Sequence, residues 1–314
     1  MLVSYSWNLG NPRIYYLYRS GDFFLLFDRR ANLRTVCLLK LSPEKSMKHF
    51  VVAITSGQLL FFAQLAYATG FVFACANRAK TTPLSIITIG IMVIAVVCNG
   101  LALGLRYYHS WPMMPMYLGL PALLCCMGVI WLLGSSHRLL KSARTEGLLI
   151  QGVIVFLAII TLLFPKDFYL PFLRSATIWS HLFLITGIVA KGCLLMASIK
   201  ALIFWLYHQK NKTGKKKTLS SAMPWALWGF VCLTVSMFTG EVWSYLGWGT
   251  PVVWHDPAIT TIMAIWFYWI AYLHLHYTPG WHPPRRAIFM VIGGLLLITF
   301  ACHPDMGPFR FPFR

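Results

Sequence analysis

Long apolar runs, separated by short polar connections, follow one another along most of this chain. Eight such runs lie near residues 50–76, 84–105, 116–134, 147–165, 176–207, 222–242, 258–277 and 286–303. Each comes close to the roughly 20 apolar residues that a helix needs to cross the hydrocarbon core of a bilayer. A span in lipid must satisfy its own backbone hydrogen bonds, so each run is predicted to be a helix. The pattern therefore predicts an all-α, polytopic integral membrane protein with about eight transmembrane helices.

The composition agrees with this prediction and removes two other classes of protein. Of the 314 residues, 58% are hydrophobic and 11% are charged, and the mean hydropathy is +0.65. A soluble domain carries about 25% charged residues, so a soluble protein is excluded. The net charge of +19 does not indicate nucleic-acid binding, because the basic residues form short clusters between the apolar runs. Such clusters are typical of the residues that fix membrane orientation.

The basic clusters also predict which way the helices run. The connections at 78–80, 138–144, 210–217 and 285–286 are rich in Lys and Arg, and the alternate connections are poorer in them. The positive-inside rule places the rich set in the cytoplasm. Both termini are then expected on the outer face, together with the connection 243–257.

The first 46 residues differ from the rest of the chain. They contain seven basic residues and no apolar run long enough to span a membrane. One interpretation is a basic N-terminal extension lying at the membrane surface. The other is that the native product starts at Met47, so that 47–314 is the whole transmembrane domain. Basic residues on the outer face would oppose the positive-inside rule, which favours the second interpretation.

The cysteines carry no recognisable chemistry of their own. The chain has eight, without a CxxC or CxxCH pattern, and seven of them lie within or at the ends of apolar runs. Cysteine in such surroundings behaves as a small apolar side chain. The sequence therefore predicts neither a disulfide framework nor covalent haem attachment to this chain.

The outer connection 243–257 has an unusual composition. It is rich in Trp, Gly and Pro, includes one His and contains no Lys or Arg. Tryptophan at the membrane–water interface is often part of an aromatic belt. The alternative is that these tryptophans form a platform for a flat, apolar and partly charged ligand. Asp followed by Pro is also a helix-start signal. The candidate ligand-binding residues of this connection are Trp243, Trp248, Trp254, His255 and Asp256.

Two histidines inside apolar runs are candidate ligands. His181 is about one turn into the fifth run, and His274 is near the inner end of the seventh. Ionisable groups in a span mark functional sites by default, and a neutral imidazole is an effective axial ligand for iron. The alternative role for each is an interhelical hydrogen bond. His303 lies at the outer end of the last run, and Lys191 in mid-run needs a partner.

The segment GEVWSYLGWGTPVVWHDPAITTIMAIWFYWIAYLHLHYTPGW resembles the core of cytochrome c assembly proteins of the CcsA/ResC type. These belong to a tryptophan-rich, haem-handling group that includes CcmC and CcmF. The resemblance extends to His181 and to Tyr107–Tyr117, and it covers most of residues 50–303. The residues that match the family pattern W-G-x-x-W-x-W-D-P, Y-L-H and G-W are Trp248-Gly249, Trp254, Asp256-Pro257, Tyr272-Leu273-His274 and Gly280-Trp281.

The resemblance implies a protein that receives haem and presents it on the outer face for attachment to apocytochrome c. It implies haem b, bound transiently and without a covalent bond, on the tryptophan platform. His181 matches the first outer axial ligand, and His274 matches an intramembrane haem ligand. The sequence departs from the pattern at V-V-W-H-D and in its C-terminal end, so the second outer ligand is either His303, which we favour, or His255.

The resemblance also implies a membrane partner of the CcsB/ResB type, which supplies a second intramembrane ligand. The expected location is a bacterial cytoplasmic membrane with the haem-binding connection facing outward. Whether the chain forms part of a haem lyase is left open. Two other functions remain as alternatives: a b-type cytochrome subunit of a quinol-linked electron-transfer complex, and a non-enzymatic transporter or regulator.

Overall fold

The computed structural model describes residues 15–20, 23–28, 43–76, 82–110, 119–136, 144–163, 177–210, 216–252, 254, 257–275 and 277–302. The chain divides into two compact units, residues 1–55 and 56–314. The first unit contains an antiparallel pair of strands, β1 (Tyr15–Ser20) and β2 (Phe23–Asp28), in a register that pairs Tyr15 with Asp28. The sequence analysis predicted no strand here. The aromatic residues of both strands and the Gly21-Asp22 sequence between them are typical of a hairpin.

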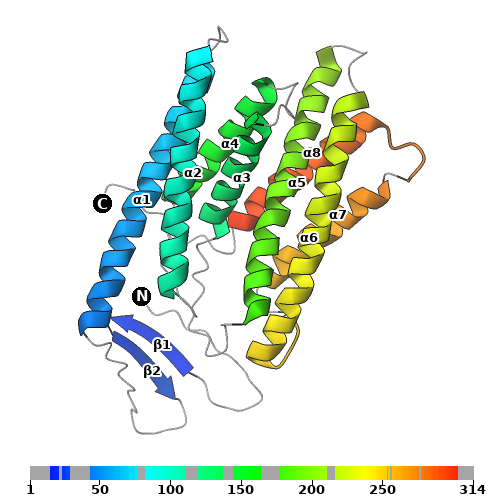
Figure 1. The fold of residues 1–314 in the computed structure, drawn as a ribbon. Helices are drawn as coiled ribbons and strands as arrows, with labels where there is room; N and C mark the ends of the chain where they lie inside the picture. Colours follow the sequence, from blue (N-terminus) through cyan, green and yellow to red (C-terminus); the bar gives the residue numbers. More distant parts are fainter. Residues whose placement is uncertain are drawn as a thin grey trace. The chain divides into compact units, whose positions relative to one another are not determined.

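The described residues of the second unit are almost entirely helical (Figure 1). Within them, each predicted apolar run lies on a helix, so the prediction of eight helices is confirmed. The helices are α1 (Pro43–Ala76, which begins in the first unit), α2 (Thr82–Ser110), α3 (Gly119–Ser136), α4 (Arg144–Leu163), α5 (Ile178–Lys210), α6 (Lys216–Trp248), α7 (Pro257–Leu275) and α8 (Pro283–Cys302).

Six of these helices are long and apolar enough to cross a membrane: α1, α2, α4, α5, α6 and α8. The apolar parts of α3 and α7, Gly119–Gly134 and Ile259–Leu275, are shorter. At 1.5 Å per residue the 19 residues of α7 are still about 28 Å long, close to the ~30 Å thickness of a hydrocarbon core. The chain is a polytopic integral membrane protein.

Helix α6 is longer at both ends than the predicted run 222–242. Pro224, expected in the first turn, therefore lies inside the helix. At the other end the helix continues to Trp248, where Gly249 takes a φ of 75° and its N–H donates to the Tyr245 carbonyl at 2.8 Å. A glycine in this left-handed conformation is a common helix stop. Residues 243–248 are consequently helical, and the irregular connection is shorter than predicted.

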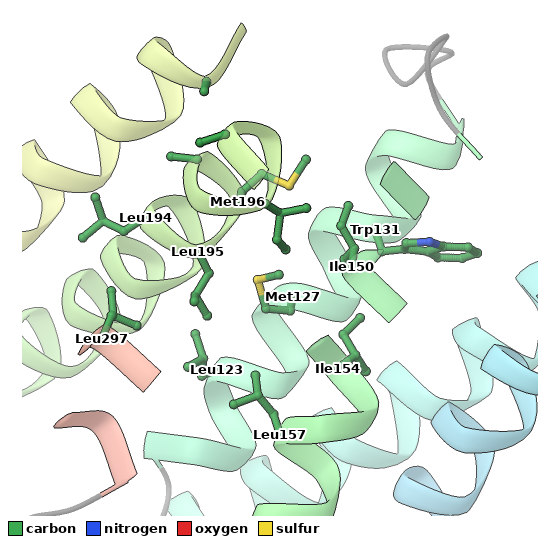
Figure 2. Close-up of a cluster of buried hydrophobic side chains, with 14 of the residues drawn as sticks. Leu123, Met127, Trp131, Ile150, Ile154, Leu157, Leu194, Leu195, Met196 and Leu297 are labelled. Atoms are coloured by element: carbon green, nitrogen blue, oxygen red, sulfur yellow. The ribbon is translucent and has the colours of Figure 1, made fainter. Parts of the chain in front are cut away.

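The core of the second unit is built around α5, which packs along α6 and also contacts α3, α4 and α8. Figure 2 shows one part of this core, where Leu123 and Met127 of α3, Ile154 of α4 and Leu195 of α5 point toward one another. Small residues allow the helices to approach closely, as is usual between membrane helices. The side chain of Ser198 on α5, for example, donates to the Met290 carbonyl of α8 at 2.9 Å.

The contact between α5 and α6 gives a testable prediction. A Cβ at Gly229 would lie 2.7 Å from Leu194 Cγ and 3.1 Å from the Leu194 backbone nitrogen, whereas a Cβ at Gly100 would meet nothing within 4 Å. We expect Gly229→Ala to destabilise the protein by about 1–3 kcal/mol through overpacking. Gly100→Ala, the matched control, should stabilise it slightly because alanine favours helix over glycine. The thermal unfolding midpoints of both variants are measured in the same detergent. Equal midpoints for Gly229→Ala and Gly100→Ala would contradict this packing.

A buried ion pair joins α4 to α5. The Lys200 ammonium donates to Oε1 of Glu146, and both side chains are more than nine-tenths buried. Glu146 lies in the first turn of α4, where the helix dipole favours an anion. The sequence analysis named neither residue. The pair satisfies two charges that lipid would otherwise penalise strongly.

Candidate functional site

The N-terminal turn of α5 positions His181, the first candidate ligand. The Thr177 hydroxyl accepts from the Ser180 N–H at 3.4 Å, and the Ser180 hydroxyl donates to the Thr177 carbonyl at 2.7 Å. The first of these bonds caps the helix, because a side-chain oxygen accepts from a backbone N–H of its first turn. His181 follows in the first turn and is half-buried. Its imidazole therefore stands on a fixed helix end, where the sequence analysis expected it.

The His181 ring contacts the end of α2. Its centroid lies 5.5 Å from that of Tyr107, with 54° between the ring planes. The neighbouring residue, Arg106, is half-buried, and its Nε donates to the Ser56 hydroxyl of α1 at 2.6 Å. One end of the helices therefore holds an imidazole and a phenol in contact, with a guanidinium one residue away. The sequence alone did not pair His181 with Tyr107.

Trp243 lies on α6, and its indole stacks on another aromatic ring of this chain. Its centroid is 5.9 Å from that of Phe183, with 21° between the planes. Gly240 makes room for this arrangement, since a Cβ there would lie 2.8 Å from the Phe183 ring. Phe183 is two residues beyond His181, which places the two on nearly opposite sides of α5. The Trp243–Phe183 contact and His181 thus lie on different sides of α5.

The connection after α6 keeps one candidate tryptophan at the surface. The Ser244 hydroxyl donates to the Thr250 carbonyl at 2.9 Å, which ties the start of the connection back to the helix. Trp254 is 65% exposed, so one face of an indole is accessible to a ligand. Trp248 is the last residue of α6. The candidates outside the described side chains are Trp248, His255, Asp256 and His303.

His274 belongs to a separate location, near the end of α7 opposite to Pro257. The two are 17 positions apart on the helix, about 25 Å along the axis. The ring is exposed, and its Nδ1 lies 2.8 Å from the Ile270 carbonyl. A carbonyl can only accept, so Nδ1 carries the proton and Nε2 of the neutral ring keeps its lone pair. A backbone bond of this kind is how proteins orient a ligating histidine.

These two candidate histidines lie on different helices, α5 and α7. Among the described residues, no three His, Cys, Asp or Glu side chains gather to hold a bare metal ion. Haem requires less of the protein, because the porphyrin surrounds the iron and the protein supplies only axial ligands. The arrangement of His181 and His274 fits that requirement. Lys191, the other polar residue named from the sequence, is half-buried on α5.

Comparisons with known proteins place the chain in a family. The Cytochrome C assembly protein family model matches residues 52–302. The cytochrome c biogenesis protein CcsA of Chlamydomonas reinhardtii is 26% identical over 192 residues, which cover 57% of this chain and 53% of that protein. The proteins of the same name from Prochlorococcus marinus strain MIT 9515 and Synechococcus sp. strain CC9902 are 38% and 36% identical over 75 residues.

The match therefore spans about half the length of the algal relative and about a quarter of the two cyanobacterial ones. The family model covers more of this chain, from the first membrane helix to the last residue of α8. The chain belongs to the cytochrome c assembly protein family.

Proposed function

We propose that this protein is a haem-handling membrane component of cytochrome c biogenesis. It receives haem and presents it on the outer face for attachment to apocytochrome c. The observation that carries the proposal is the position of His181 in a member of this family, at the capped end of α5 and in contact with Tyr107, the residue after Arg106.

Each of these groups suits one part of haem b. A neutral imidazole binds the iron axially, which is the role proposed for His181. A guanidinium makes strong, charge-assisted hydrogen bonds to carboxylates, so Arg106 is the proposed partner of a propionate. The porphyrin face is apolar and stacks on indoles, for which Trp254 offers an exposed ring. His303 or His255 is the proposed second outer ligand.

We further propose a second haem position at His274, inside the membrane and shared with another protein. The imidazole is exposed on α7, and its Nδ1 bond leaves Nε2 to bind iron. A ligand exposed on the surface of its own chain is accessible to a haem held partly by a neighbour. A membrane partner of the CcsB/ResB type would supply the opposite ligand there.

The chain's own contribution would be to bind, orient and release haem. The thioether bonds would form between the haem vinyl groups and the cysteines of the client, so that chemistry belongs to the cofactor and the client. The proposed location is a bacterial cytoplasmic membrane with His181 toward the outer face, since the basic connections favour the opposite side for the cytoplasm.

Deletion of the gene in its own host tests this function. We expect c-type cytochromes with covalently attached haem to disappear, while the client polypeptides are still synthesised and exported. Haem staining of denaturing gels, with immunoblots of the same clients as the control, measures both. A plasmid copy of the gene should restore the stain. Normal staining in the deletion strain would refute a role in cytochrome c assembly.

A further inference from the structure

Three uncharged polar side chains are buried at mid-length of α1 and α2. Gln64, Tyr67 and Asn99 are 3%, 0% and 0% exposed. Both amide atoms of Gln64, the Tyr67 hydroxyl and the Asn99 Oδ1 have no hydrogen-bond partner. In a bilayer no bulk solvent can reach such groups, and burying them unpaired is costly. These four atoms therefore need a hydrogen-bond partner that the described residues do not supply.

The three side chains lie at one level. Gln64 and Tyr67 are three residues apart, so they share a face of α1. The neighbouring helix runs antiparallel to it, because Arg106 bonds Ser56 at one end and Met92 lies against Gly70 toward the other. That register places Asn99 level with Gln64. The Tyr67 hydroxyl is near the Asn99 amide, without a hydrogen bond of good geometry between them.

Helix α3 closes the third side of this cluster. The Asn99 Nδ2 donates to the Pro121 carbonyl at 3.2 Å, which uses one of its donors and leaves Oδ1 as an acceptor. The Tyr67 hydroxyl reaches α3 at Gly128, where a Cβ would lie 2.9 Å from it and 2.6 Å from Val96. Only a residue without a side chain lets the phenol lie this close to the α3 backbone.

We propose that Gln64, Tyr67 and Asn99 form a buried water site between α1, α2 and α3. The unpartnered atoms include both donors and acceptors, and none of the three side chains is charged, so they suit a neutral ligand that can donate and accept. Full enclosure of the three side chains favours the smallest such ligand. An internal water typically makes two to four hydrogen bonds to polar groups that would otherwise be unsatisfied, and these residues offer four such atoms.

Radiolytic footprinting of the purified full-length chain in nanodiscs, with water enriched in heavy oxygen, tests the site. Hydroxyl radicals form where water is, so we expect Tyr67 to acquire the heavy label although it is fully buried. Met92 is the matched control, because it is equally buried and its side chain lies against Gly70 of α1. Met196, buried elsewhere in the core, is a second control. Both methionines should stay unlabelled.

The double variant Gln64→Leu/Asn99→Leu removes water's partners and keeps the approximate side-chain volumes. We expect Tyr67 labelling to be lost in it, while an unchanged thermal unfolding profile shows that the chain still folds. Should the variant not fold, the comparison of Tyr67 with Met92 in the wild-type protein decides alone. Three results would each overturn the water site. Tyr67 could stay unlabelled in the wild type, or Met92 could be labelled as strongly as Tyr67. An organic molecule could also be extracted from the wild type and be absent from the double variant.

Discussion

Replacement of His181 by alanine is expected to lower haem attachment to c-type cytochromes by more than about 10- to 100-fold. Loss of an outer-shell partner of a metal ligand already costs that much, and His181 is proposed as the ligand itself. The variant should still insert and fold, because the cap of α5 is made by Thr177 and Ser180 and does not involve the imidazole. Haem staining in the deletion strain carrying the variant measures the loss.

The matched control for this experiment is His282→Ala. His282 is an exposed histidine that precedes α8 and has no proposed contact with haem. We expect the control to restore haem staining to the wild-type level, with both variants present in membranes in equal amounts. Full restoration by His181→Ala would contradict the assignment of His181 as an outer ligand.

Among the substitutions considered, Lys200→Met is expected to lower the free energy of unfolding the most. It removes the partner of Glu146 and leaves an uncompensated carboxylate between α4 and α5. Breaking a buried ion pair in this way costs about 3–5 kcal/mol in free energy of unfolding. Unfolding by a denaturing detergent, titrated into mixed micelles and followed by circular dichroism, gives the value for each variant.

The double variant Glu146→Gln/Lys200→Met separates loss of charge pairing from loss of packing. It removes the stranded carboxylate, so most of the stability lost in the single variant should return. We expect the wild type and the double variant to have similar free energies of unfolding, and Lys200→Met to have a much lower one. A double variant as unstable as the single one would show that packing of the lysine chain, not its charge, joins the two helices.

The helices could be predicted from the sequence because each depends on its own residues. Length and apolarity suffice to locate a membrane span, and they placed all eight. The end of α6 was harder, because Trp243 and Trp248 looked like part of a loop. The backbone there simply continues as a helix until Gly249 supplies the left-handed stop. Nothing before that glycine prevents helix formation.

Contacts between distant residues could not be predicted in the same way. Lys200 and Glu146 are 54 positions apart, and a sequence read in order offers no reason to pair them. The same holds for the contact of His181 with Tyr107. The position of His181 at a helix start was predictable, since it follows from local residues. The orientation of Trp243 toward Phe183 was not, because an indole stacks equally well on a neighbouring ring or on a ligand.

The proposal that haem binds at His181 is tested most directly by the absorption spectrum of the protein purified with its membrane partner. We predict bound haem with the Soret band of a histidine-ligated iron in the wild type. In His181→Ala the haem content should fall, and the remaining spectrum should be that of haem bound without this ligand. Haem content and spectrum identical to the wild type in His181→Ala would contradict the account.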